Sequence, residues 1–171
     1  TIDIEIQNIL QEELKNAVNI TQAESANGII MDPSTGDILA IASIPDFNPN
    51  KYYNYNLESF KNRSISDSYE PGSTLKIIPL IASMKYNHSI MNEKIFCENG
   101  SYNLTPFNKL NDHEPHDSLS IKDIFIHSSN IGISKIVNEI NHKDIYQLCK
   151  KFGFGTKTGL PFKSESNGKL R

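Results

Sequence analysis

Residues 69–76 read Tyr-Glu-Pro-Gly-Ser-Thr-Leu-Lys, and the prediction of fold and chemistry starts from this stretch. Ser73 and Lys76 are three positions apart, so on a helix they share one face, with Cβ atoms about 5–6 Å apart. The preceding Pro-Gly pair is a turn signal, which places Ser73 where a loop enters a helix. A serine hydroxyl needs a neighbouring base to become a nucleophile. A lysine serves as that base only when burial lowers its pKa and leaves it neutral.

A second polar element, His-Ser-Ser-Asn-Ile-Gly, occupies residues 127–132. A hydroxyl at Ser128 is able to relay a proton between Lys76 and a leaving group, and the amide of Asn130 carries both a donor and an acceptor. Ser-x-x-Lys followed by Ser-x-Asn is a pattern of serine acyl-transfer enzymes. The alternative is that residues 128–130 only cap the next helix, because Ser and Asn are favoured N-caps. The order and spacing of the two motifs favour the catalytic interpretation.

Further segments match the pattern of a known family and extend over most of the chain. They are residues 1–3, 6–7, 23–25, 31–40, 45–50, 62–67, 152–155 and 158–161. Together with the two motifs they resemble the transpeptidase domain of class B penicillin-binding proteins, most closely the division-specific, FtsI-type member. Glu70 before Pro-Gly-Ser is more similar to the division type than to the elongation type, where a second proline is usual.

The resemblance implies an α+β fold of the penicillin-binding, serine β-lactamase-like type, with an antiparallel sheet flanked by helices. Residues 1–171 would form the N-terminal part of one such domain, truncated before the strand that carries the family's third motif. Lys157-Thr158-Gly159 spells that third motif, but the surrounding glycines and Pro161 predict a loop there. We therefore expect Lys157 not to be catalytic and these residues alone to show no appreciable transpeptidase activity.

The resemblance also implies a function, peptidoglycan D,D-transpeptidase, which cross-links stem peptides ending in D-Ala-D-Ala during septal wall synthesis. Ser73 would form the acyl-enzyme, with Lys76 as its base and Ser128 as proton donor to the leaving amine. Asn130 would position the substrate, and the backbone N–H of Ser73 would supply half of an oxyanion hole. β-Lactams would acylate the same serine. No metal and no organic cofactor are expected.

Three alternatives remain open on the same residues. The chain is also compatible with an elongation-type penicillin-binding protein. It is compatible with a serine hydrolase, either a D,D-carboxypeptidase or a β-lactamase, in which a carboxylate such as Glu70 would activate water. The third alternative is an inactive scaffold that acts only as a partner.

Composition and charge constrain the partners and the location. A net charge of −3 and a pI near 5.9 give no electrostatic footprint for nucleic acid. No run of about 18 apolar residues and no signal peptide is present. The resemblance implies a membrane anchor before Thr1, a catalytic domain that faces the periplasm from the bacterial inner membrane, and division-machinery proteins as partners.

Hydrophobic periodicity predicts the main helices and strands. An amphipathic helix is expected over residues 2–19, and two buried strands at 28–31 and 38–42 are joined by the turn 32–37. Further helices are expected at 74–86 with a bend at Pro79, at 120–125, at 131–140 and at 142–151.

The segment His113-Glu114-Pro115-His116-Asp117 holds residue types that bind metals. The proline breaks any helical geometry, and the sequence shows no distant cluster that would complete a site. We therefore expect a solvated loop without a metal.

Two side-chain pairings are expected elsewhere. Cys97 and Cys149 either form a disulfide or remain separate thiols, and the helical apolar pattern around Cys149 favours thiols. Arg63 is expected to hold its loop by a charge-assisted bond to a carboxylate such as Asp67.

Overall fold

The computed structural model describes residues 1–170, which form two compact units. The first unit comprises residues 1–68 and 157–167, and the second comprises residue 69 to residue 156 and residue 168 onward. The expectation of one partial domain over the whole chain stays a prediction.

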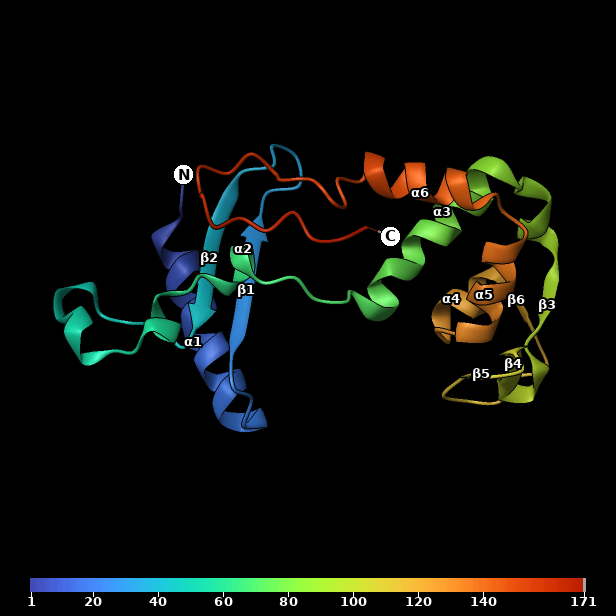
Figure 1. Ribbon diagram of the computed structural model, residues 1–171, viewed down its shortest axis with the longest axis horizontal. Coiled ribbons are helices and arrows are strands. Elements are labelled where there is room, and N and C mark those ends of the chain that lie inside the picture. The colour runs from blue at the N-terminus through green and yellow to red at the C-terminus, as the bar shows by residue number, and fades with distance from the viewer. Residues whose placement is uncertain (171) are drawn as a thin grey trace. The chain divides into compact units, whose positions relative to one another are not determined.

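In the first unit a helix packs on a β-hairpin (Figure 1). Helix α1 runs over Ile4–Thr21. It packs against strands β1, Ala26–Met31, and β2, Ile38–Ile44. The Asp3 side chain caps α1 by accepting from the backbone N–H groups of the first turn. The side chain of Gln7 donates to and accepts from the backbone of Ile41 at 2.9 Å, which fixes the helix on the hairpin. The predicted helix and both strands are confirmed, with ends that differ by at most two residues.

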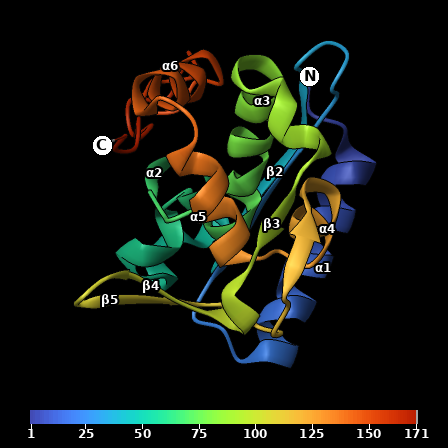
Figure 2. The same ribbon diagram turned by 90° about the vertical axis from the view of Figure 1, so that its right-hand side faces the viewer.

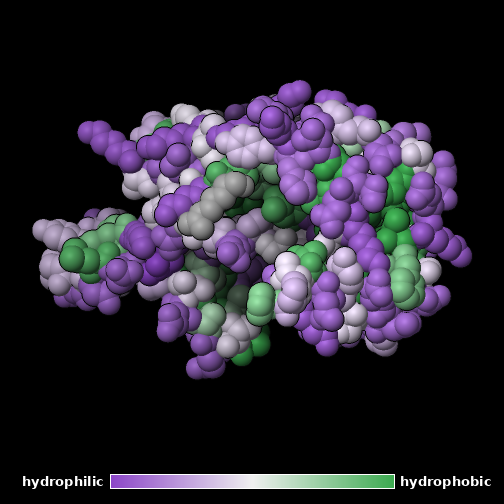
Figure 3. All heavy atoms as spheres, turned by 45° about the vertical axis from the view of Figure 1, so that its right-hand side comes forward, coloured by the Kyte–Doolittle hydropathy of each residue, from purple (hydrophilic) through white to green (hydrophobic). Residues whose placement is uncertain are grey.

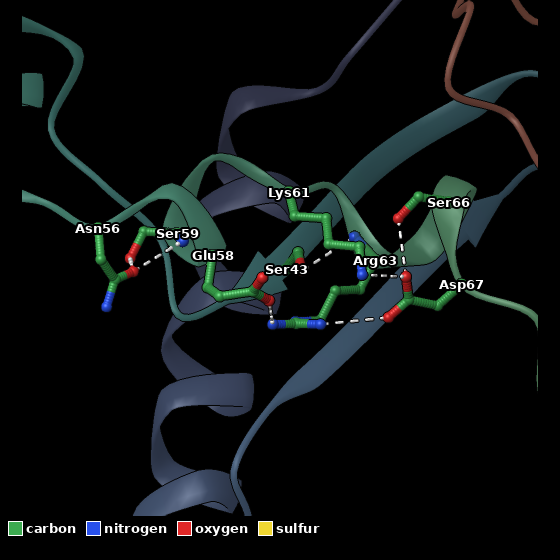
Figure 4. Close-up of polar contacts among 8 residues, drawn as sticks. All are labelled: Ser43, Asn56, Glu58, Ser59, Lys61, Arg63, Ser66 and Asp67. Atoms are coloured by element: carbon green, nitrogen blue, oxygen red, sulfur yellow. Dashed lines mark hydrogen bonds and ion pairs between the residues drawn. The ribbon is translucent and has the colours of Figure 1, made fainter.

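Residues 45–68 lead from this hairpin toward the nucleophile through short helical turns. These are η1 at Pro49–Asn54, η2 at Leu57–Phe60 and α2 at Arg63–Ser66. Arg63 donates to Asp67 at 3.2 Å and to Glu58 at 2.8 Å, and Figure 4 shows its guanidinium between the two carboxylates. The predicted Arg63–Asp67 bond is therefore confirmed, and Glu58 is an additional partner.

The second unit is built on helices. The segment η3 at Gly72–Lys76 continues into α3 at Ile77–Tyr86, followed later by α4 at Ile121–Ile126, α5 at Asn130–Asn138 and α6 at His142–Lys151. Figure 2 shows α5 beside α3, and their buried side chains form one core. The core residues are Ile78, Ala82, Ile90, Cys97, Leu119, Ile121, Ile124, Ile136, Ile140, Leu148 and Cys149. All four predicted helices of this unit exist.

The nucleophile helix differs from the prediction in its first turn. The turn that holds Ser73 is a 3-10 helix, and the α-helix begins only at Ile77. Pro79 is the third residue of α3, where a missing N–H removes little from the helix. The change from 3-10 to α-helix occurs before the proline, and the bend at Pro79 stays a prediction.

Short strand pairs and turns connect α3 to α4. Strand β3, Lys94–Phe96, pairs with β6, Ser118–Ser120, and strand β4, Ser101–Thr105, pairs with β5, Asn108–Asn111; both pairs are antiparallel. The turns η4, His88–Asn92, and η5, Glu98–Gly100, lie between them. Within residues 1–170 the strands therefore form three two-stranded sheets.

Several surface and core properties bear on the predictions. Cys97 and Cys149 are both buried free thiols, so the expectation of separate thiols is confirmed.

Within residues 1–170 no helix combines the length and apolarity that crossing a membrane requires. Figure 3 shows hydrophobic side chains reaching the surface among hydrophilic ones, and in the first unit Ile29 and Met31 are 46% and 55% exposed.

Candidate active site

The nucleophile candidate, Ser73, lies in the accessible first turn η3 of the second unit. Gly72 directly before it has φ +59°, a left-handed conformation that glycine adopts without steric cost. The Thr74 hydroxyl donates to the backbone carbonyl of Pro71 at 2.5 Å, so it is tied to the turn. The hydroxyl of Ser73 is therefore exposed and makes no hydrogen bond within this turn.

Lys76 is buried, with 8% of the residue exposed, at the end of the same turn. Its Nζ donates to three acceptors at the start of α5: the Ser128 carbonyl at 2.5 Å, Ser128 Oγ at 2.9 Å and Asn130 Oδ1 at 2.8 Å. The two predicted motifs, more than fifty residues apart in sequence, thus meet at one nitrogen.

The pKa of Lys76 is lowered from the ordinary lysine value of 10.5, chiefly because burial disfavours its charged form. The negative charge of Asp112 acts in the opposite direction and raises this pKa. An apolar cavity of about 280 Å³, lined by residues that include Leu75, Ile133 and Val137, adjoins Lys76. This apolar wall explains the desolvation, and it favours the neutral amine that a general base requires.

Ser128 lies between the lysine and the nucleophile. Its Oγ is 3.0 Å from Ser73 Oγ and 2.9 Å from Lys76 Nζ. Among the described residues no hydrogen bond joins Ser73 directly to Lys76, so the hydroxyl of Ser128 is the link. Ser128 has φ +55°, a conformation that costs a non-glycine residue about 1–2 kcal/mol. The bond from Lys76 to the Ser128 carbonyl helps to hold this strained turn.

Ser129 performs the structural role that the sequence offered as an alternative. It is the N-cap of α5, and its Oγ accepts from the backbone N–H of Gly132 at 2.9 Å. Its neighbours Ser128 and Asn130 contact Lys76 instead. Within residues 128–130, Ser129 therefore caps the helix, and Ser128 and Asn130 bind Lys76.

Asn130 is oriented by a second contact. Its Nδ2 donates to the backbone carbonyl of Asn111 at 2.9 Å, which leaves Oδ1 facing Lys76. A carbonyl oxygen has two lone pairs and the amide has a second N–H, so Asn130 keeps capacity for a substrate contact.

Asp112 supports this site and was missed from the sequence. Its carboxylate accepts from Ser129 Oγ at 2.5 Å and from the backbone N–H groups of Asn130 at 2.5 Å and Ile131 at 3.1 Å. An anion is stabilised at a helix N-terminus by these unpaired N–H groups and by the helix dipole. Because Asp112 lies 17 or more residues before its partners, no local capping pattern points to it.

The Lys157-Thr158-Gly159 triplet is not on a strand, as predicted from its glycines. Gly159 has φ +88°, and both the backbone N–H and the hydroxyl of Thr158 donate to Glu165 at 2.6 Å. The triplet is a loop of the first unit stabilised by its own contacts.

The segment 113–117 has a partner that the sequence analysis did not find. The expectation that no distant residue completes its ligand set is wrong, because His127 at the end of α4 lies beside Glu114 and His116. The chain folds back between β5 and α4, and only the tertiary structure shows this proximity.

Comparisons with known proteins agree on one family. The family described as "Penicillin binding protein transpeptidase domain" matches residues 27–171. "Peptidoglycan D,D-transpeptidase FtsI" of Buchnera aphidicola subsp. Schizaphis graminum is 34% identical over 99% of this chain and 29% of that protein. The protein of the same name from Escherichia coli K12 is 32% identical over 98% of this chain and 28% of its own length. The chain therefore spans less than a third of these relatives.

A solved structure supports the same assignment. The crystal structure of a peptidoglycan glycosyltransferase from Burkholderia ambifaria superposes with a TM-score of 0.86 at 25% identity. That match covers 99% of this chain and 49% of the other chain.

Proposed function

The chain belongs to the penicillin-binding protein transpeptidase family, and from this premise we propose that it carries the nucleophile half of a serine D,D-transpeptidase site. The observation that supports the proposal most strongly is the hydrogen-bonded series Ser73 Oγ, Ser128 Oγ, Lys76 Nζ, with steps of 3.0 Å and 2.9 Å. It connects an exposed hydroxyl to a buried amine whose pKa is lowered by desolvation.

Acylation would proceed through this series. Ser73 Oγ attacks the carbonyl carbon of the penultimate D-Ala while its proton passes to Ser128 Oγ, whose own proton passes to neutral Lys76. The peptide C–N bond breaks, and the proton returns through Ser128 to the nitrogen of the terminal D-Ala, which leaves. An amine from a neighbouring stem peptide then attacks the ester, forms the cross-link and restores the Ser73 hydroxyl. General acid–base steps of this kind contribute about 10²–10⁴ in rate.

The proposal assigns separate positioning roles to Asn130 and to the backbone of Ser73. Asn130 holds Lys76 through Oδ1 and offers its remaining hydrogen-bonding capacity to the substrate peptide. The backbone N–H of Ser73 supplies one donor to the developing oxyanion, and one such donor is typically worth about 10²–10³ in rate.

Hydrolysis is the competing reaction on the same residues. It requires a carboxylate that is free to activate water, and the carboxylate of Asp112 is occupied by three donors of the α5 terminus. Glu70 is exposed in the loop before Ser73. Asp112 is therefore committed to the helix, and Glu70 stays the candidate that would activate water in the hydrolase alternative.

The cellular role is also part of the proposal. From the FtsI-type resemblance of the sequence, in which Glu70 precedes Pro-Gly-Ser, we infer a septal role, a location on the periplasmic side of the inner membrane and partners in the division machinery. An elongation role remains the second candidate, because the names of the relatives do not distinguish the two roles.

Intact-mass spectrometry after exposure to benzylpenicillin tests the proposal. We expect one adduct per chain that persists for hours, no adduct in Ser73→Ala and an unchanged adduct in the matched control Thr74→Ala. An adduct that disappears within seconds would support the hydrolase. Absence of any adduct from the folded chain, or its retention in Ser73→Ala, would contradict the assignment.

A further inference from the structure

A group of three potential metal ligands lies outside the acyl-transfer residues of the second unit. Glu114, His116 and His127 each offer one donor atom, and the three atoms lie within 4.8 Å of one another. Glu114 Oε2 is 3.7 Å from His116 Nε2 and 4.0 Å from His127 Nδ1. Two of these residues follow β5 and the third ends α4, so the fold assembles the group.

The spacing fits a zinc ion after a small contraction. Zinc binds imidazole nitrogen and carboxylate oxygen at about 2.0–2.2 Å, which puts tetrahedral ligand atoms roughly 3.4 Å apart. The two separations that involve Glu114 exceed that value by about 0.3 Å and 0.6 Å, and the separation of the two histidine nitrogens is at most 4.8 Å, so the rings also have to approach each other. The Glu114 side chain is 65% exposed, so it is free to move by this amount.

A second observation points to a ligand at the same place. His116 Nε2 is buried and has no hydrogen-bond partner among residues 1–170. Buried polar atoms without a partner are uncommon and call for an explanation such as an ion. The ring of His127 lies against that of His116, with centroids 4.6 Å apart and tilted by 47°. The unpaired nitrogen of His116 therefore lies close to one further imidazole nitrogen and one carboxylate.

We propose that Glu114, His116 and His127 bind one zinc ion, with water in the fourth position. Two neutral imidazoles and a carboxylate are ligand types that zinc accepts. His127 directly precedes Ser128, so the bound ion would tie the 114–116 loop to the turn that carries the relay hydroxyl. This site holds structure in place and does not touch the reacting atoms.

The alternative is a purely ionic group, in which Glu114 pairs with protonated histidine and no metal is held. The two explanations differ in a titration with zinc, because a metal site takes up one ion and a purely ionic group takes up none.

Calorimetric titration of the chain with zinc chloride, after dialysis against a chelator and at a pH about one unit above 6.5, tests the proposal. We expect one ion per chain. Glu114→Gln and His116→Ala should each weaken binding by at least about tenfold, and the control His113→Ala, in the same loop, should bind as the parent chain does. Absence of binding, or equal affinity in all these variants, would overturn the proposal.

Two further measurements keep the test decisive. Cobalt(II) in place of zinc should give the visible absorption of a tetrahedral site, and an octahedral spectrum would count against the ligand set. Should His116→Ala fail to fold by circular dichroism, the exposed Glu114→Gln variant decides. Ser73→Ala should bind zinc unchanged, so this result is independent of the proposed acyl transfer.

Discussion

Replacing Asp112 by asparagine removes a negative charge that acts on both motifs of the site. The carboxylate holds the α5 terminus through Ser129 Oγ and the N–H groups of Asn130 and Ile131. The same charge raises the pKa of Lys76. Asparagine keeps the size and one acceptor oxygen, so the substitution isolates the charge.

The magnitude follows from the contacts. Hydrogen bonds to a charged group contribute about 1.5–3 kcal/mol, against about 0.5–1.5 for neutral ones, so two N–H bonds lose about 2 kcal/mol together. Loss of the favourable charge at the helix N-terminus adds about 0.3–1 kcal/mol. Because Asp112 is half-buried, hydrogen bonds to water offset part of the lost energy. We therefore expect a decrease of about 1–2 kcal/mol in the free energy of unfolding.

The effect on catalysis has two parts. If a similar energy is lost in positioning Ser128 and Asn130, acylation slows by roughly 5–30-fold, since each 1.36 kcal/mol is tenfold in rate. In addition, the pKa of Lys76 falls further, so the midpoint of the pH–rate profile moves to lower pH. A loss of structure alone would lower the rate without moving that midpoint.

Time-resolved intact-mass measurement of benzylpenicillin acylation across pH, together with urea unfolding, checks these numbers. Asp117→Asn, an exposed carboxylate on the same loop, is the control and should change neither quantity. The reasoning would be refuted if Asp112→Asn kept the parent stability, rate and midpoint.

Other predictions concern the base, the relay, the core and the approach loop. The acylation rate should rise with pH and level off below 10.5, because burial lowers the pKa of Lys76 and only its neutral form accepts the proton; a midpoint at or above 10.5 would contradict this. Ser128→Gly keeps the left-handed turn but removes the relay hydroxyl, so the acylation rate measured by mass spectrometry should fall by about 10²-fold or more, and a parent-like rate would exclude the relay. Gly132→Ala places a Cβ 2.6 Å from Ile124, and urea unfolding should show a loss of about 1–3 kcal/mol, whereas an unchanged midpoint would mean that α4 moves freely. Arg63→Lys should lower the thermal midpoint less than Arg63→Ala, because lysine retains the positive charge but cannot donate to Asp67 and Glu58 from two sides as the guanidinium does. Equal decreases would show that the guanidinium geometry, and not the charge, stabilises the loop.

The α+β fold of the penicillin-binding type was predicted from the family resemblance and is confirmed by the likeness to solved structures. Local patterns predicted the individual helices and strands. Apolar periodicity predicted α1 and α6, and the turn at 32–37 predicted the β1–β2 hairpin, because these elements depend on neighbours in sequence.

The supports of the site were not predictable in the same way. Asp112 and the carbonyl of Asn111 reach the α5 terminus across 17 or more residues, and single-sequence patterns contain no such contacts. His127 was singled out only as part of its motif, although it lies beside Glu114 in space. The 3-10 geometry around Ser73 was missed as well, since both helix types share the same spacing of Ser73 and Lys76 along one side of the turn.

The central claim is that Ser73 is the acylated nucleophile. Trypsin cleaves after Arg63 and Lys76, so the benzylpenicillin-treated chain should yield a modified peptide of residues 64–76. Tandem mass spectrometry should place the adduct on Ser73, although the same peptide contains Ser64, Ser66 and Ser68. An adduct on any other residue, Ser128 included, or an unmodified peptide from the folded chain would contradict the account.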